Sequence, residues 1–172
     1  MLSIILDLRC SPHQPSPDMV VRTLAGLVAG VVQTLVRDVT MIACERHDFI
    51  DAIADEAGCD ILIAEHNVLT AAIQKAREDH ILILQAGALI DADVLDEARE
   101  EIESGLAYRS LIMRARPHNF ITRLYPDWCR AVGILAHRRN LLACVGKDER
   151  LSALMRHVPH RATFASHLRI MR

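Results

Sequence analysis

Short apolar runs rich in β-branched residues alternate with longer segments that are apolar at every third or fourth position. The runs are typical of buried strands, and the longer segments predict amphipathic helices. Asp18 precedes one such segment and Gly58 follows another, as capping residues do. The predicted strands are Leu2–Leu8, Val39–Cys44, Asp60–Ala64 and Ile81–Leu84; the predicted helices are Met19–Val36, Asp48–Ala57, Asn67–Ala76 and a segment from Asp91 or Asp93 to Ser104.

This alternation of strands and helices determines the predicted fold class. Brief loops between successive strands and helices imply right-handed βαβ units, and such units build a mainly parallel sheet buried on both faces. We therefore expect one α/β domain with a Rossmann-like core and helices on both faces. In such sheets ligands bind beyond the carboxyl ends of the strands. The candidate site is then formed by the loops Asp7–Ser11, Cys44–Asp48, Glu65–Asn67 and Gln85–Ala88.

The pattern changes after Gly105. Two further strands are predicted at Ala107–Arg114 and Val132–Ala136, the second leading into a helical segment, Arg138–Ala143. Asn119–Trp128 is predicted as helix or irregular structure. We expect an α/β domain over residues 1–146 and a basic C-terminal tail over residues 147–172, which packs on the domain or extends from it.

Composition narrows the class of protein. The chain has 172 residues, of which 51% are hydrophobic and 3% aromatic, so one domain with an aliphatic core is expected and single-stranded nucleic acid would find no stacking platform. The five cysteines are widely spaced, which fits reduced thiols. No leader is apparent, and polar residues interrupt the apolar segment Met19–Val36. These features predict a cytoplasmic protein that does not bind nucleic acid.

Charge is divided along the chain. Residues 38–104 carry seventeen Asp and Glu against four Lys and Arg, whereas residues 105–172 carry thirteen Lys and Arg against three Asp and Glu. Solvated helix faces and mutual neutralisation are one explanation. The alternative is that residues 105–172 bind phosphate groups, an acidic protein partner or an anionic membrane surface at the inner face of the membrane. Self-association as a homodimer is a further alternative.

The order of these elements resembles a known family. The resemblance rests on LSIILDLR, RTLAGLVAGVVQTLVRDVTMI, AIADEAGCDIL, KAREDHILILQAGALIDADVLDEA and RAVGILAHRRNLLACVG. In this order and spacing the runs resemble the family-two glycosyltransferases, which have the nucleotide-diphospho-sugar transferase (GT-A) fold. The resemblance covers roughly residues 1–146. It implies a protein that transfers a sugar from a nucleotide sugar to a glycan or cell-envelope acceptor.

The resemblance also implies which residues hold the nucleotide sugar. Asp7 and Arg9 stand in the family's first loop, and Asp48 matches the last acid of its second loop, although Cys44 replaces an aspartate at the second strand's end. Arg138 and Arg139 could clamp a diphosphate; exposed arginines at a helix start are the alternative.

The family's metal-binding acidic pair would stand after the fourth strand, where this chain has Gln85 and Gly87. Gln85 offers one neutral oxygen and Gly87 offers no side chain, so Mn²⁺ or Mg²⁺ binding is disfavoured. Asp91 and Asp93 lie further on, where carboxylates cap a helix, with metal binding as the alternative. A transferase that inverts the anomeric centre needs a general base, and Asp127 beside Trp128 is the candidate.

Two hypotheses follow. The first is a small glycosyltransferase-like enzyme whose donor cleft contains Arg9, Asp48, Gln85 and the Arg138–Arg139 pair. The second is a non-catalytic relative that keeps the scaffold and acts as a ligand-binding or protein-interaction module. The missing acids favour the second, and the retained loop residues favour the first.

Overall fold

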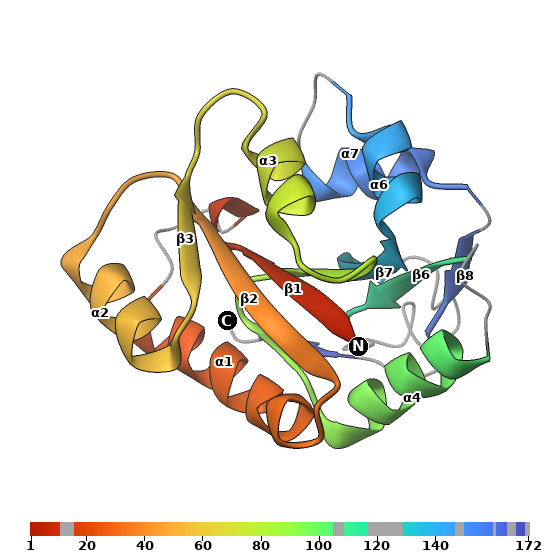
Figure 1. Ribbon diagram of the computed structural model, residues 1–172, viewed down its shortest axis with the longest axis horizontal. Coiled ribbons are helices and arrows are strands. Elements are labelled where there is room, and N and C mark those ends of the chain that lie inside the picture. The colour runs from red at the N-terminus through yellow and green to blue at the C-terminus, as the bar shows by residue number, and fades with distance from the viewer. Residues whose placement is uncertain are drawn as a thin grey trace.

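A β-sheet runs through the centre of the protein in this computed structural model (Figure 1). The structure describes residues 1–10, 16–104, 109–116, 129–146, 150–159, 161–164 and 168–170. Within these residues the sheet has seven strands: β1 (Leu2–Asp7), β2 (Val36–Ala43), β3 (Asp60–Ile63), β4 (His80–Gln85), β6 (Ser110–Arg114), β7 (Ala131–His137) and β8 (Arg161–Thr163).

The strand order is β3-β2-β1-β4-β7-β6-β8. Strands β3, β2, β1 and β4 are parallel, as are β6 and β8, whereas β7 runs antiparallel to both β4 and β6. The predicted α/β class with a mainly parallel sheet is confirmed. Because β7 is reversed, its first residues lie beside the carboxyl end of β4.

Helices cover both faces of the sheet, as predicted (Figure 1). Leu27, Ile50 and Leu95 belong to the core on one face, and Leu69, Leu141 and Leu154 to the core on the other. The helices of the first face are α1 (Pro17–Val32), α2 (Asp48–Ala57) and α4 (Ala92–Glu103), and those of the second are α3 (Val68–Lys75), α6 (Arg138–Cys144) and α7 (Leu151–His157).

Local sequence explains the helix limits. Ser16 accepts a hydrogen bond from the Met19 backbone N at 3.3 Å, and Pro17 fits the first helical position, so α1 begins there. Gly58 follows α2 with φ +65°, a left-handed conformation that glycine adopts without strain. The predicted helix to Val36 is too long, since Thr34 has φ +57° and the chain then enters β2 at Val36.

The described residues of the segment 147–172 pack on the α/β domain. They provide α7, which packs in the second core, and β8, which lies beside β6 in the main sheet. A second small sheet pairs β5 (Ala88–Leu89) with β9 (Arg169–Ile170). The described C-terminal residues are thus integrated into the α/β body. The predicted segment Asn119–Trp128 lies outside the described residues. No described helix is both long and apolar enough to cross a membrane.

Candidate functional site

The carboxyl ends of β1 and β4 lie side by side at one edge of the sheet. Asp7 and Gln85 are paired in register, and the Ala86 backbone N donates a hydrogen bond to the Asp7 carbonyl at 3.1 Å. The chain then turns at Gly87, where φ is +85°, and the Gly87 N donates to Thr23 Oγ1 of α1 at 3.2 Å. This hydrogen bond ties the turn after β4 to a buried helix position.

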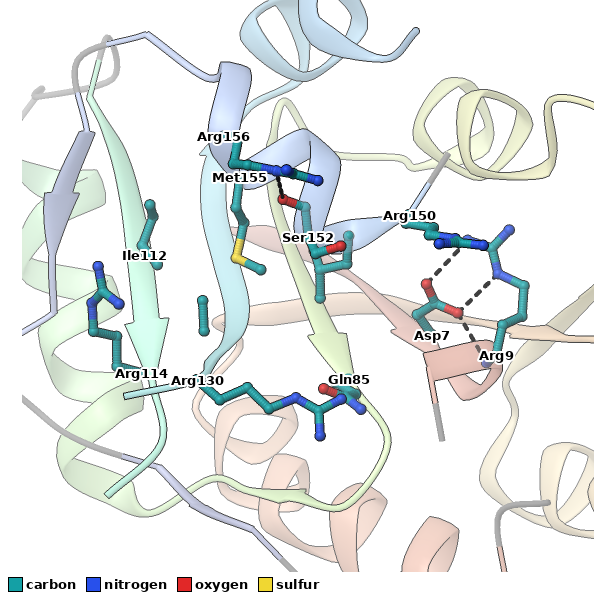
Figure 2. Close-up of a pocket in the computed structure, with 12 residues that line it drawn as sticks. Asp7, Arg9, Gln85, Ile112, Arg114, Arg130, Arg150, Ser152, Met155 and Arg156 are labelled. Carbon is teal, nitrogen blue, oxygen red and sulfur yellow. Dashed lines mark hydrogen bonds and ion pairs between the residues drawn. The ribbon is translucent and has the colours of Figure 1, made fainter. Parts of the chain in front are cut away.

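A pocket of about 730 Å³ opens at this edge (Figure 2). It is strongly cationic, because five arginines and a single carboxylate are among the described residues that line it, and arginine stays charged at all working pH values. The remaining lining residues are polar or aliphatic. The full lining is Asp7, Arg9, Gln85, Ile112, Arg114, Arg130, Ala131, Arg150, Leu151, Ser152, Met155 and Arg156.

Asp7 holds Arg9 in a fixed orientation. Arg9 Nε lies 2.9 Å from Asp7 Oδ1 and Arg9 Nη2 lies 3.0 Å from Oδ2, a bidentate arrangement. The Arg9 backbone N also donates to Asp7 Oδ1 at 3.0 Å. The Asp7 side chain is 1% exposed and the Arg9 side chain 18%. The carboxylate therefore serves to orient a guanidinium group at the pocket wall.

Arg114 ends β6, and Arg130 immediately precedes the neighbouring strand β7. Arg114 is paired in register with Ala131, the residue after Arg130. Arg114 Nη1 donates to the Cys129 carbonyl at 3.0 Å, and the Ala115 backbone N donates to the Arg130 carbonyl at 2.8 Å. Arg130 reaches this edge of the sheet because β7 is antiparallel to β4.

Helix α7 supplies a further wall of the pocket (Figure 2). Arg150 is its N-cap residue, and Ser152 and Met155 also line the space. Arg156 Nε donates to the Ser152 carbonyl at 3.3 Å. Arg150 and Arg156 are both exposed.

Sequence reasoning located part of this pocket. Asp7, Arg9 and Gln85 line it, and Gly87 forms the adjoining turn. Asp48 does not line it: it is exposed at the first residue of α2.

The two aspartates after the turn lie at the start of α4 and are not among the pocket-lining residues. Asp91 is the N-cap residue and Asp93 is in the first turn, although the Asp91 side chain makes no capping hydrogen bond. The candidate base Asp127 lies outside the described residues.

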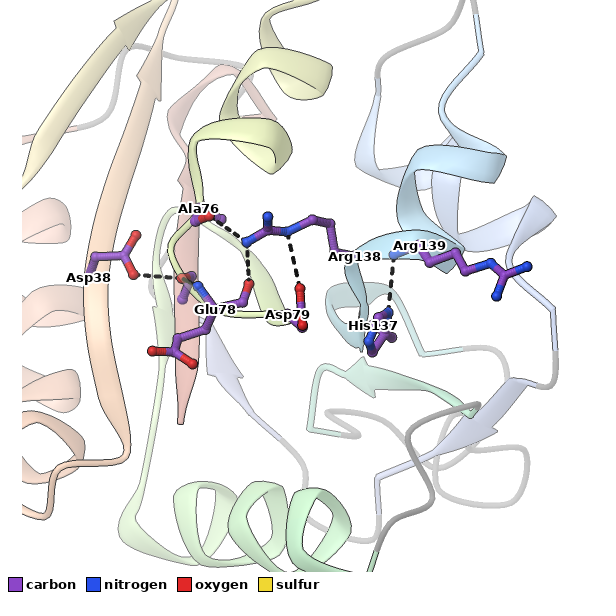
Figure 3. Close-up of polar contacts among 8 residues, drawn as sticks. Asp38, Ala76, Glu78, Asp79, His137, Arg138 and Arg139 are labelled. Atoms are coloured by element: carbon purple, nitrogen blue, oxygen red, sulfur yellow. Dashed lines mark hydrogen bonds and ion pairs between the residues drawn. The ribbon is translucent and has the colours of Figure 1, made fainter.

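The prediction that Arg138 and Arg139 share this cleft is wrong. They follow the carboxyl end of antiparallel β7, which lies at the opposite edge of the sheet, next to the start of β4. Figure 3 shows Arg138 Nη2 donating to the carbonyls of Ala76 and Glu78, and Arg138 Nε lies 3.7 Å from Asp79 Oδ1. These contacts of Arg138 stabilise the loop before β4.

Two histidines lie at that opposite edge. The ring centroids of His80 and His137 are 5.7 Å apart, and His80 Nε2 is buried with no hydrogen-bond partner among the described residues. Burial, and then the proximity of His137, lower the pKa of His80 below its ordinary value. Burial also raises the pKa of Cys144, and burial with the neighbouring Asp60 raises the pKa of Cys59 to about 11, so neither thiol is an activated nucleophile.

Four of the five arginines were missed as site residues. Arg114, Arg130, Arg150 and Arg156 all come from the basic half of the chain, residues 105–172. The excess of Lys and Arg in that half was the available signal, and phosphate binding was among the explanations offered for it. Only the folded arrangement shows which of those thirteen basic residues gather at the carboxyl edge.

Comparison with solved structures identifies the fold. The chain is similar to glucosyl-3-phosphoglycerate synthase from Mycobacterium tuberculosis in complex with Mn²⁺, uridine diphosphate and glucosyl-3-phosphoglycerate, with TM-score 0.66 and 10% identity over 94% of this chain and 68% of that one. It is also similar to a 4-diphosphocytidyl-2C-methyl-D-erythritol synthase, with TM-score 0.64 and 15% identity over 99% and 92%. For HddC from Yersinia pseudotuberculosis the values are 0.59 and 10% over 95% and 90%.

A scan against protein-family models and a search of curated proteins found no match. At these identities the structural likeness concerns the fold alone. The protein has a GT-A-like nucleotide-diphospho-sugar transferase fold, and the arginine-lined pocket lies at the carboxyl edge of its sheet.

Proposed function

We propose that the pocket binds a nucleotide-diphosphate sugar and that the protein is glycosyltransferase-like, passing the sugar to a glycan or cell-envelope acceptor. The observation that carries this proposal is the lining of the pocket, five arginines at the carboxyl edge of a GT-A-like sheet. Guanidinium groups pair with phosphate oxygens through a planar fork of donors. The similar synthase from Mycobacterium tuberculosis was solved with uridine diphosphate, which supports this class of ligand.

Arg9 and Arg150 are the proposed contacts of the diphosphate. Both line the pocket at the β1 side, where Figure 2 shows them near Asp7. Because Asp7 already fixes the Arg9 guanidinium through two hydrogen bonds, binding a phosphate there costs less side-chain entropy than binding by a mobile arginine. Gln85, 8% exposed, adds an amide at the neighbouring strand end.

The residues present do not fit a divalent metal. Mg²⁺ and Mn²⁺ prefer several oxygen ligands, with carboxylates among them. At the turn after β4, Gln85 supplies one neutral oxygen, Gly87 supplies no side chain, and Asp7 is bound by Arg9. In the part of the chain that the structure describes, no cluster of three His, Cys, Asp or Glu is arranged to hold a metal. We infer that arginines neutralise the diphosphate in place of a metal.

The second candidate is a non-catalytic nucleotide-sugar-binding protein. This candidate is favoured because Asp7 is the one carboxylate among the described lining residues, and both of its oxygens accept hydrogen bonds from Arg9. Sugar transfer with inversion needs a carboxylate that can take a proton from the acceptor. Asp127 remains the proposed base under the first candidate.

Thermal unfolding with a panel of nucleotide diphosphates and nucleotide sugars tests binding. In EDTA, a nucleotide present at a hundredfold excess over its Kd should stabilise the protein by about 2.7 kcal/mol, a shift in Tm of roughly 5–10 °C for a domain of this size. Arg150→Gln should weaken the shift, and Arg139→Gln, at the opposite edge, should leave it unchanged. No shift with any nucleotide at millimolar concentration would refute the proposal.

Release of nucleotide from a bound nucleotide sugar separates the two candidates. A transferase releases the nucleoside diphosphate at a rate that rises with acceptor, and Asp127→Asn should lower that rate without changing the binding shift. Binding without release, in the presence of a mixed glycan acceptor pool, would establish the non-catalytic candidate instead.

A further inference from the structure

Helix α1 exposes a row of apolar side chains, the α1 stripe, along its outer side. The stripe consists of Val21, Ala25, Val28 and Val32, whose spacings of four, three and four residues place them on one side of a helix. Val21, Val28 and Val32 are 47%, 57% and 76% exposed, and Ala25 is exposed as well. The stripe extends over three helical turns, about 16 Å. It lies opposite the side of α1 that is buried in the core.

The sequence of α1 provides no polar side chain to cover this stripe. From Leu24 to Val32 the helix is apolar on every side, and a helix of that kind is normally buried all round. The charged residues of α1 are Asp18 and Arg22, which pair with each other at 3.1 Å near its N-terminal end. A contiguous apolar surface with a polar rim marks an interaction site.

The rim of the α1 stripe is acidic on both sides. Helix α1 lies between α2 and α4 on one face of the sheet and packs against both (Figure 1). Helix α2 carries four Asp and Glu and no Lys or Arg, and α4 carries six Asp and Glu and one Arg. Asp55 and Glu56 of α2 and Glu100 of α4 are among the exposed acids. The surface is therefore apolar along its middle and strongly negative along its margins.

The acidic margins determine which kind of partner fits. In a symmetric contact between two copies of this stripe, the acidic helices of both copies would face each other, and such like charges repel. An anionic membrane surface would be repelled for the same reason. A partner that carries Lys and Arg on both sides of an apolar ridge complements the stripe and its margins together. An amphipathic helix has this form, and its ridges pack against another helix over several turns.

We propose that the α1 stripe, with α2 and α4 on its sides, is a docking surface for a basic amphipathic helix of a partner protein. Apolar side chains of the partner pack on Val21, Val28 and Val32, and its Lys and Arg face the acids of α2 and α4. The proposal is independent of the function proposed above, because none of the described pocket-lining residues belongs to α1, α2 or α4.

Fluorescence anisotropy of a labelled model peptide tests this surface. The probe is a helical peptide of about 18 residues, or five turns, with Leu along one side and Lys on both flanks. Two matched peptides replace Lys by Glu or Leu by Ser. The Leu/Lys peptide should bind with one peptide per chain, and both matched peptides at least about tenfold more weakly, the loss that corresponds to about 1.4 kcal/mol. Salt at about 1 M, where the Debye length is about 3 Å, should weaken binding.

Val28→Asp separates apolar docking from simple charge attraction. The substitution adds a negative charge, so attraction between charges alone would bind the basic peptide more tightly. Docking on the stripe predicts the opposite, a loss of about thirtyfold, which is the size of a hot-spot effect. Val28 is more than half exposed, so the variant should fold. Val32→Ser is a second variant and should lose about fivefold. The matched control is Ala71→Asp, at an exposed position of α3 on the other face, which should bind as the wild type does.

Reversal of the margin charges tests the second half of the proposal. Asp55→Lys combined with Glu100→Lys should weaken the Leu/Lys peptide about fivefold at low salt. Glu65→Lys, in the loop after β3, should not.

Absence of peptide binding by the wild type, or equal or tighter binding in Val28→Asp, would overturn the proposal. A wild-type dimer in sedimentation velocity that Val28→Asp dissociates would assign the stripe to a second copy instead. The nucleotide-dependent shift in Tm should be the same in Val28→Asp as in the wild type, so the two proposals fail separately.

Discussion

Replacing Asp7 by Asn probes the ion pair that orients the pocket. Asp7 is nearly fully buried, and its two oxygens accept from Arg9 Nε and Nη2 at 2.9 and 3.0 Å. Hydrogen bonds to charged groups contribute about 1.5–3 kcal/mol each. The Asn amide keeps one acceptor oxygen but presents N–H groups to the other arm of Arg9. We therefore expect a loss of about 3 kcal/mol in the free energy of unfolding, between the loss of one bond and of both.

Urea unfolding followed by circular dichroism measures this loss, as a lower midpoint with an unchanged slope. A loss of this size should lower Tm by roughly 6–12 °C for a domain of this length. The substitution also removes the only negative charge among the described lining residues, which include five arginines. Added phosphate should therefore stabilise Asp7→Asn more than the wild type.

Asp18→Asn is the matched control. Asp18 pairs with Arg22 at 3.1 Å on the surface of α1, with both side chains about three-fifths exposed. Such a pair contributes less than about 1 kcal/mol. An Asp7→Asn protein as stable as Asp18→Asn, or one that phosphate fails to rescue, would refute the reasoning that the Asp7–Arg9 pair organises a cationic pocket.

Three further predictions concern stability. Folding lowers the pKa of His80, so the stability that neutral His80 contributes is complete above the ordinary pKa of about 6.5 and is lost as pH falls toward the lowered pKa of the folded state. The free energy of unfolding should therefore depend less on pH in this range in His80→Gln, but not in His66→Gln. Gly26→Ala places a Cβ 2.8 Å from the Ile90 carbonyl oxygen and should lower Tm, whereas Gly146→Ala, with open space, should not. Arg138→Gln should cost about 1–3 kcal/mol in denaturant unfolding while nucleotide affinity stays unchanged.

The first four strands were predictable because each contains a short apolar run between clear helix signals, although β2 begins at Val36 and not at the predicted Val39. The pairing of Asp7 with Gln85 follows from that order, since both residues end parallel strands that neighbour each other. Three of the twelve described lining residues, Asp7, Arg9 and Gln85, could therefore be located from the sequence.

The position of other lining residues depends on strand direction and on long-range packing. A run such as Ala131–His137 reads as a buried strand whether it is parallel or antiparallel to its neighbours, and direction decides which of its ends reaches the pocket. The reversal of β7 brings Arg130 to the site and carries Arg138 away from it. Arg150 and Arg156 arrive through the packing of α7, a long-range contact that no local pattern encodes.

The turn at Gly87 also limits how this pocket can change by mutation. Its φ of +85° lies where residues with a Cβ are strained, at a cost of roughly 1–3 kcal/mol. An aspartate introduced there would meet this cost before it could contribute a ligand to any cation, and the cation itself would lie beside a pocket that already carries an excess of positive charge. A carboxylate ligand at this turn therefore carries a backbone cost, and the backbone at Gly87 favours retention of a pocket lined by arginines.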